Sequence, residues 1–172
     1  MTALEPQLDT PAQVGVLFVC LGNICRSPLA EGIFLDAARK RQVAGRFRVD
    51  SCGLGAWHAG ELPDERARLE ASRHGLTLTH RARQVRAPHD FLEFRWILAM
   101  DRSNAARLTN LGAPASRLRL MRSFDPTLPV SERFDAEVPD PYTGGERDFQ
   151  EVFGLLRSAC EGLLDHLIRC PE

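Results

Sequence analysis

The sequence predicts a single α/β domain with a four-stranded parallel sheet and helices on both faces. Short apolar runs rich in branched residues alternate with helical patterns four times along the chain. Glycine and proline separate most of these segments. The length of 172 residues, with 44% hydrophobic and 26% charged residues, fits one globular domain of average composition.

The first half of the chain is expected to hold two strands and two helices. Residues 14–19 read Val-Gly-Val-Leu-Phe-Val, which is typical of a strand buried on both faces. Pro28 suits the first turn of the following helix, because the N–H that proline lacks has no partner there. Gly75 is expected to end the second helix. The four elements are expected at residues 14–19, 28–42, 47–51 and 63–74.

The second half is expected to repeat the alternation. Asp101 follows an apolar strand and is expected to cap a helix that Gly112 closes. Residues 125–145 are rich in Pro, Asp and Gly and predict a long loop. The strands are expected at 95–100 and 118–121 and the last helix at 146–168. The expected inner face of the last helix consists of Phe149, Val152, Phe153, Leu156, Leu163 and Leu167.

Composition and charge exclude several classes of protein. The net charge of −1 argues against nucleic-acid binding, and no apolar run is long enough for membrane insertion. Residues 1–13 lack the features of a secretory signal, and we expect a flexible N-terminal extension there and one domain over 14–172. The odd count of five cysteines favours free thiols in the cytoplasm. Cysteines and histidines lack zinc-site spacing, so we expect neither a metal nor another cofactor.

The loop after the first strand carries the clearest functional signal. It contains Cys20, Leu21, Gly22, Asn23, Ile24, Cys25, Arg26 and Ser27. A loop that joins a buried strand to a helix N-terminus points several backbone N–H groups inward and forms an anion site. In parallel sheets the binding crevice also lies beyond the carboxyl ends of the strands. We therefore predict a phosphate-binding loop over residues 21–27, in which Gly22 and Asn23 tolerate positive φ.

Three side chains of this loop suit nucleophilic chemistry on a phosphate ester. Cys20 lies at the base of the loop, where the N–H groups, the helix dipole and Arg26 favour its thiolate. The planar fork of Arg26 suits two phosphate oxygens. Ser27 is placed to donate a hydrogen bond to the sulfur.

Hydrolysis also needs an acid to protonate the leaving oxygen. The long loop offers three aspartates, Asp125, Asp135 and Asp140. Asp140 lies in Val-Pro-Asp-Pro-Tyr, where two prolines stiffen the backbone around one carboxylate. From the residues alone, a solvated loop aspartate is an equally good interpretation of this position.

Three segments together resemble the low-molecular-weight protein tyrosine phosphatase family. They are Cys-Leu-Gly-Asn-Ile-Cys-Arg-Ser-Pro at 20–28, Ala-Met-Asp-Arg-Ser-Asn at 99–104, and Asp-Pro-Tyr at 140–142. The resemblance extends from residue 14 to 164. It implies a metal-independent hydrolase in which Cys20 forms a phosphocysteine, and Asp140 acts first as acid and then as base. A phosphotyrosine-containing protein would be the substrate and inorganic phosphate a product.

The resemblance also implies roles around the loop. Asn23, Ser27, Ser51 and His80 match positions that hold the loop through hydrogen bonds. Cys25 matches a second thiol that traps oxidised Cys20 as a disulfide, with an ordinary loop thiol as the alternative.

The substrate rim is expected at Trp57 and Tyr142. Trp57 is equally well interpreted as a half-buried loop anchor. Many family members carry a second aromatic residue where this chain has Thr143, so regulation through a tyrosine pair is not expected. His58 and His89 are expected on the surface, and His166 is expected to pack along the last helix.

Other functions remain open at this level. Phosphatases of the same fold that act on phosphoarginine carry a small threonine where this chain has Ile24, and Ile24 favours a flat phenyl ring. An arsenate reductase would need further cysteines near the third strand, and residues 53–159 contain none. A non-catalytic phosphotyrosine-binding module would be expected to lack Cys20, Arg26 or Asp140.

Overall fold

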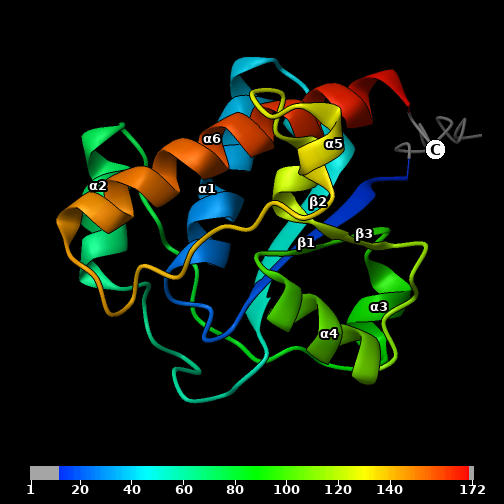
Figure 1. Ribbon diagram of the computed structural model, residues 1–172, viewed down its shortest axis with the longest axis horizontal. Coiled ribbons are helices and arrows are strands. Elements are labelled where there is room, and N and C mark those ends of the chain that lie inside the picture. The colour runs from blue at the N-terminus through cyan, green and yellow to red at the C-terminus, as the bar shows by residue number, and fades with distance from the viewer. Residues whose placement is uncertain (1–11, 171–172) are drawn as a thin grey trace, which may run out of the picture.

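The computed structural model describes residues 12–170 and has an α/β fold around a four-stranded parallel sheet (Figure 1). The strands are β1 (Val14–Cys20), β2 (Phe47–Gly53), β3 (Trp96–Ala99) and β4 (Leu118–Leu120). Their spatial order is β2-β1-β3-β4, so β1 pairs with β2 on one side and with β3 on the other. The loop after β1 therefore begins where the strand order reverses, the usual binding position in such sheets. Of the expected flexible extension over residues 1–13, residues 1–11 lie outside the described residues.

Helices cover both faces of the sheet, as predicted. In Figure 1, α1, α2 and α6 lie on one side, and α3 and α4 lie on the other. The described residues form α1 (Arg26–Lys40), α2 (Glu65–Arg73), α3 (His89–Glu93), α4 (Arg102–Asn110), α5 (Val130–Arg133) and α6 (Glu146–Arg169), with 3-10 turns η1 (Ala44–Arg46) and η2 (Met121–Phe124).

Strand β1 supplies side chains to two separate hydrophobic cores. Val16 and Phe18 pack into the core under α1 and α6, whereas Leu17 and Val19 pack into the core on the α3–α4 side. All four side chains are fully buried, which explains the unbroken apolar run in the sequence. The six apolar residues predicted for the inner face of the last helix are also buried.

Local chemistry sets several helix ends. Gly75 and Gly112 adopt positive φ after α2 and α4, which confirms them as helix terminators. Helix α2 begins at Glu65, later than predicted, because the side chain of Asp64 caps it by accepting the N–H of Arg66. Gln42 has φ of 58°, so α1 ends before it, at Lys40.

Two short helices were not predicted. Helix α3 has five residues and α5 has four, and α5 interrupts the long loop predicted over 125–145. Neither is long enough to show a helical repeat in the sequence.

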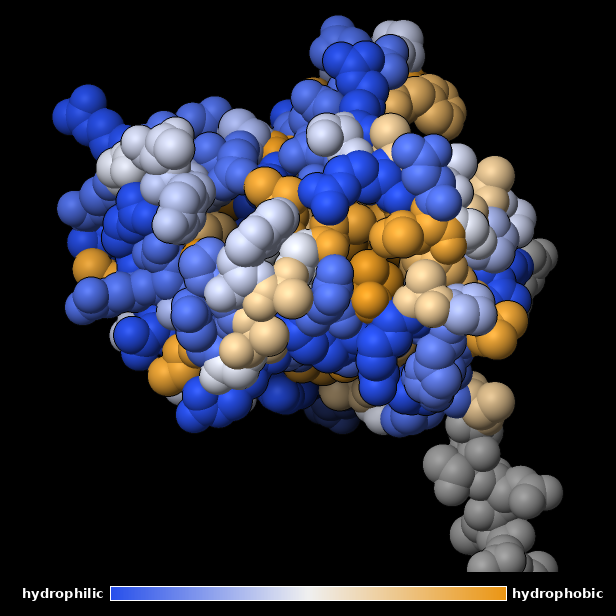
Figure 2. Space-filling model, turned by 90° about the horizontal axis from the view of Figure 1, so that it is seen from below, coloured by the Kyte–Doolittle hydropathy of each residue, from blue (hydrophilic) through white to orange (hydrophobic). Residues whose placement is uncertain are grey.

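The surface is mostly hydrophilic on the α3–α4 side. Figure 2 shows this face with polar and charged residues over most of its area and apolar residues exposed in small groups. Among residues 12–170, no helix is both long and apolar enough to cross a membrane.

Candidate active site

A cavity of about 270 Å³ lies at the carboxyl end of β1. It brings together the loop after β1, the segment after β2 and the segment before α6, which are far apart in the sequence. Most of the predicted catalytic and rim residues therefore share one site. The lining consists of Cys20, Leu21, Gly22, Ile24, Cys25, Arg26, Trp57, His58, Asp140 and Tyr142.

The thiol of Cys20 lies at the base of this cavity. Cys20 is the last residue of β1 and is 3% exposed. The backbone N–H of Asn23 donates to its Sγ at 3.3 Å, and the Oγ of Ser27 lies 3.0 Å from the same sulfur. Asn23 has φ of 58°, which curls the loop back so that its N–H faces the sulfur. The predicted positive φ is thus confirmed for Asn23.

The side chain of Asn23 fixes the direction of the hydrogen bonds around the thiol. Its Nδ2 donates to the Oγ of Ser27 at 2.8 Å and to the Oγ of Ser51 at 3.0 Å. Each hydroxyl therefore has its own hydrogen to donate elsewhere. For Ser27 the near acceptor is the sulfur of Cys20, and for Ser51 it is the Oε2 of Glu31 at 2.6 Å. This arrangement suits a thiolate that accepts two hydrogen bonds.

The amide oxygen of Asn23 joins the loop to the segment after α2. The backbone N–H of Arg83 donates to Oδ1 at 2.9 Å, which identifies that atom as the oxygen. The Nε2 of His80 lies 2.9 Å from the same oxygen, so Nε2 is the ring nitrogen that carries the hydrogen. Asn23 and Ser27 of the loop are thus joined to Ser51 and His80 in one hydrogen-bond network.

The guanidinium of Arg26 is almost completely buried and tightly held. Its Nη1 donates to the Oδ2 of Asp101 at 2.7 Å and to the carbonyl of Val138 at 3.0 Å. Its Nη2 donates to the Oδ2 of Asp140 at 3.0 Å. Of five N–H groups, Nε–H and one on Nη2 have no hydrogen-bond partner among the described residues. Nε and Nη2 share one edge of the guanidinium, which suits two oxygens of one phosphate.

Asp101 has two functions, of which the sequence indicated one. Its Oδ1 accepts the N–H of Asn104 at 2.6 Å, which confirms the predicted cap of α4. Its Oδ2 accepts from Arg26, a contact that was not predicted. Asp101 comes just after β3, and the carboxyl ends of parallel β1 and β3 lie at the same sheet edge. That shared edge is the signal that could have linked the two residues.

Asp140 lies at the mouth of the cavity. Two residues earlier, the N–H of Val138 donates to the carbonyl of Met100 at 2.8 Å and fixes the long loop beside β3. The Oδ1 of Asp140 accepts the N–H of Tyr142 at 3.1 Å, and Oδ2 contacts Arg26. Its side chain is 44% exposed, so the carboxylate can meet both a bound group and water.

Comparison with known proteins identifies the family. Residues 15–170 match the profile described as "Low molecular weight phosphotyrosine protein phosphatase". The chain belongs to this family. It is 45% identical over 150 residues to low molecular weight protein-tyrosine phosphatase A of Mycobacterium tuberculosis, covering 87% of this chain and 89% of that protein.

Solved structures of family members have the same fold. A protein tyrosine phosphatase from Entamoeba histolytica aligns with a TM-score of 0.84 at 34% identity, covering 91% of this chain and 98% of that chain. A Drosophila arginine phosphatase aligns with a TM-score of 0.78 at 33% identity, covering 88% and 96%. The fold is therefore common to proteins named for two phosphorylated side chains.

In this family member, Arg66 joins the segment of Asp140 to α2. Its Nη1 donates to the carbonyl of Gly144 at 2.9 Å, and its Nη2 donates to the carbonyl of Tyr142 at 3.0 Å. The carboxylate of Asp64 holds the same guanidinium through Nε and Nη2. The N–H of Asp64 in turn donates to the carbonyl of Ile24 in the loop. The start of α2 therefore connects the two sides of the cavity.

The rim differs from expectation in two places. Trp57 and Tyr142 line the cavity and are 66% and 50% exposed, as expected for rim residues. His58, expected on the surface, is half-buried and lines the wall, with Nδ1 2.8 Å from Glu61. Gly22 does not adopt positive φ. A Cβ there would lie 3.2 Å from the ring of His58, so close approach accounts for this glycine.

The second thiol of the loop is present but shielded. Cys25 lines the cavity, is 5% exposed and lies immediately before α1. Burial, together with the nearby carboxylate of Asp64, raises the pKa of the Cys25 thiol. All five cysteines are free thiols in the structure. A thiol of this kind reacts slowly unless its partner is already oxidised.

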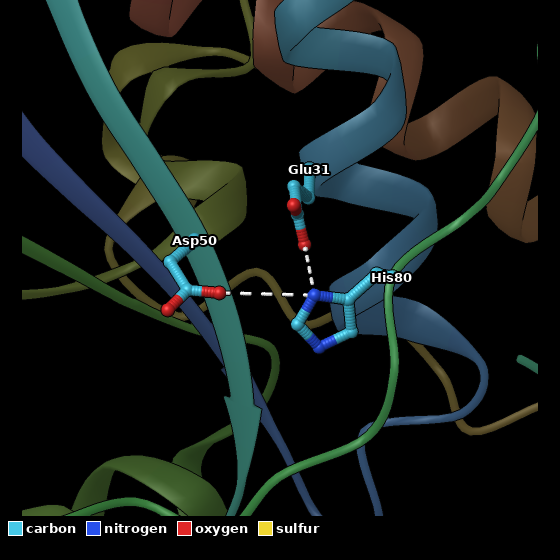
Figure 3. A group of neighbouring side chains, drawn as sticks. All are labelled: Glu31, Asp50 and His80. Atoms are coloured by element: carbon cyan, nitrogen blue, oxygen red, sulfur yellow. Dashed lines mark ion pairs between the residues drawn. The ribbon is translucent and has the colours of Figure 1, made fainter. Parts of the chain in front are cut away.

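A cluster of titratable side chains lies behind the loop. Figure 3 shows Glu31 of α1, Asp50 of β2 and His80 pointing toward one another. The Nδ1 of His80 lies 3.2 Å from the Oε2 of Glu31 and 3.7 Å from the Oδ1 of Asp50. Burial raises the pKa of Glu31 to about 7 and lowers the pKa of His80. Neither Glu31 nor Asp50 was predicted from the sequence, because the three residues are far apart in the chain.

Proposed function

We propose that this protein is a protein tyrosine phosphatase in which Cys20 is the nucleophile, Arg26 binds the phosphate, and Asp140 is the general acid and base. One observation carries the proposal. The Sγ of Cys20, which accepts the N–H of Asn23, lies in the same cavity as Arg26 and the carboxylate of Asp140. This arrangement supplies a nucleophile, an anion clamp and a proton donor.

The first step transfers the phosphoryl group to the protein. The phosphate oxygens bind the N–H groups of loop residues 21–27 and the Nε–Nη2 edge of Arg26. The thiolate of Cys20 attacks the phosphorus from behind, and a P–S bond forms as the bond from phosphorus to the tyrosine oxygen breaks. Asp140 gives its proton to that oxygen, so that tyrosine leaves as a neutral phenol.

The second step releases phosphate. Asp140, now ionised, takes a proton from a water molecule that attacks the phosphorus. The P–S bond breaks, inorganic phosphate forms, and the sulfur leaves as a thiolate. The hydroxyl of Ser27, 3.0 Å from the sulfur, donates a hydrogen bond to it and stabilises this leaving group.

The walls of the cavity support an aromatic phosphate ester as substrate. Trp57 and Tyr142 flank the mouth, and Ile24 contributes an apolar surface beside Cys20. Relatives named protein-tyrosine phosphatases are consistent with this choice. In this proposal a single phosphatase domain covers residues 14–172 and acts on phosphotyrosine-containing proteins in the cytoplasm, where five free cysteines would remain reduced.

The test measures release of p-nitrophenol from p-nitrophenyl phosphate, at mildly acidic pH with a chelator present. We expect the wild type to hydrolyse p-nitrophenyl phosphate and Cys20→Ser to bind phosphate without hydrolysing the ester. Asp140→Asn should slow esters with poor leaving groups more than those with good ones, because poor leaving groups need the proton most. Equal slowing for both would refute the role of Asp140 as acid. An inactive, freshly reduced wild type would refute the proposal.

Phosphoarginine is a second candidate substrate, because the Drosophila arginine phosphatase shares the fold. Ile24 lines the cavity beside the scissile group and leaves less room for a branched guanidinium than threonine would. We therefore expect phosphotyrosine to be preferred over phosphoarginine, and Ile24→Thr to reduce that preference by about 10-fold. A wild type that prefers phosphoarginine would reverse the assignment.

A further inference from the structure

The cluster behind the loop has the composition of a metal-ligand set. It offers one imidazole nitrogen and two carboxylate oxygens, from Glu31, Asp50 and His80, all within 4.8 Å of one another. The three side chains come from α1, β2 and the segment after α2, so the fold holds each ligand on a separate element (Figure 3). They lie behind the residues that contact phosphate and do not line the active-site cavity.

The hydrogen bonds of the three side chains leave a further lone pair on each ligand atom when the ring of His80 is neutral. Nε2 of His80 donates to Asn23, so the neutral ring presents the lone pair of Nδ1 to the two carboxylates. The Oε2 of Glu31 accepts from the hydroxyl of Ser51, and the Oδ1 of Asp50 accepts from the N–H of Ser51. Each carboxylate oxygen retains a second lone pair.

The spacing fits a small divalent cation. Tetrahedral zinc with bonds of about 2.0–2.1 Å places neighbouring ligand atoms about 3.3 Å apart. The Nδ1 of His80 lies 3.2 Å from Glu31 and 3.7 Å from Asp50. Both distances from Nδ1 therefore lie within about 0.4 Å of this spacing, and the two carboxylate oxygens lie within 4.8 Å of each other.

A neighbouring arginine orients one of the ligands, and a second cavity connects the cluster to solvent. Arg83 holds the Oδ2 of Asp50 at 2.8 Å and turns Oδ1 toward His80, an arrangement typical of partners that orient metal ligands. A second cavity of about 310 Å³ lies between α1 and residues 75–80 and is lined in part by Glu31 and His80. It gives an ion a path from solvent and room for a water molecule as fourth ligand.

We propose that Glu31, Asp50 and His80 form a binding site for a divalent transition-metal cation such as Zn²⁺, separate from the catalytic cavity. The bound cation holds His80 with Nε2–H toward Asn23 and so stabilises the loop that carries Cys20. No metal was expected from the sequence, because its cysteines and histidines lack zinc-site spacing and these three ligands are far apart in the chain. The site takes no part in phosphoryl transfer and does not depend on the proposed function.

The test titrates the chelator-treated protein with ZnCl₂ by calorimetry. The background is Cys20→Ser, which removes the thiol at the base of the catalytic cavity as a competing zinc ligand. We expect one zinc ion per chain, and binding at least about tenfold weaker in Glu31→Gln, since even losing an outer-shell partner costs that much. The matched control is Glu93→Gln, from a second His-carboxylate group formed by His89, Asp90 and Glu93, which should bind zinc as the background does.

Two further measurements keep the test independent of folding defects. Zinc should raise the melting temperature of the background and of Glu93→Gln, but not that of Glu31→Gln. Cobalt bound in place of zinc should show no sulfur-to-metal charge-transfer band. Absence of saturable zinc binding, equal affinity in Glu31→Gln, an equal loss in Glu93→Gln, or a sulfur band would each overturn the proposal.

Discussion

Arg66 should control how well Asp140 works as a proton donor, although it does not line the catalytic cavity. Its guanidinium joins Asp64 at the start of α2 to the carbonyls of Tyr142 and Gly144. The peptide segment that it holds begins two residues after Asp140. Without the Arg66 guanidinium, the segment around Asp140 keeps the hydrogen bond from Val138 to Met100 on one side. It loses the hydrogen bonds to Arg66 on the other side. We therefore predict that Arg66→Ala leaves phosphate binding intact and weakens proton donation.

The size of the effect follows from the two hydrogen bonds. A hydrogen bond to a charged group contributes about 1.5–3 kcal/mol when shielded from water. The Arg66 side chain is 38% exposed, so we take about 1 kcal/mol for each bond, or about 2 kcal/mol in all. That energy corresponds to a change of about 30-fold in the population of the positioned acid.

The assay compares kcat for phenyl phosphate, a poor leaving group, with kcat for p-nitrophenyl phosphate, a good one. We expect Arg66→Ala to lower kcat by up to about 30-fold for the first and much less for the second. Arg66→Lys should recover only part, because an ammonium cannot reach both carbonyls with fixed geometry. Arg68→Ala, an exposed neighbour on the same helix, is the matched control and should behave as the wild type.

A double mutant separates this role from a general loosening of the site. In an Asp140→Asn background, Arg66→Ala should have little further effect, because no proton donor is left to position. Equal slowing of both substrates, or full additivity with Asp140→Asn, would refute the reasoning.

Two further predictions concern stability, measured by urea unfolding. Burial alone would raise the pKa of the Asp125 carboxyl, but hydrogen bonds from Thr127, Ser158 and Arg122 hold it below its ordinary value of 3.8. Its contribution is therefore present above pH 3.8 and is lost as the pH falls toward the folded-state pKa, where the unfolded chain binds more protons. Asp125→Asn should lack this acid-dependent loss, whereas Asp135→Asn, which is exposed, should keep it; identical acid profiles would contradict this. Gly162→Ala should destabilise α6 by about 1–3 kcal/mol or more, because its Cβ would lie 1.8 Å from the carbonyl oxygen of Phe124. Gly154→Ala on the same helix has open space and should stabilise by about 0.5–1 kcal/mol, and a loss of stability there would contradict the argument.

The parts of the fold that sequence predicted well are those set by local chemistry. The apolar run of β1 is buried on both faces, and the left-handed glycine at 112 ends α4. Cys20, Arg26 and Asp140, which the sequence predicts to be catalytic, also line one cavity. Each of these residues is marked by its neighbours in the chain, through strand pattern, turn chemistry or flanking prolines.

What sequence missed depends on contacts between distant residues. Asp101 meets Arg26 across a separation of 75 positions, and nothing near either residue indicates the pair. Glu31 and Asp50 resemble any polar residue on a partly exposed helix or strand until the fold places His80 beside them. The ring of His58 lines the cavity, and it can approach the loop closely because Gly22 has no side chain.

The hydrogen bonds that hold the Arg26 guanidinium in one orientation should determine which anions the cavity binds. Asp101 and the carbonyl of Val138 occupy both hydrogens of Nη1, so the guanidinium cannot turn to follow an anion of another shape. An anion gains full contact only if two of its oxygens bind the Nε–Nη2 edge of Arg26 while a third faces loop residues 21–27. Tetrahedral oxyanions such as vanadate, arsenate and sulfate should therefore compete with phosphate, whereas halides and planar nitrate should compete poorly despite their charge.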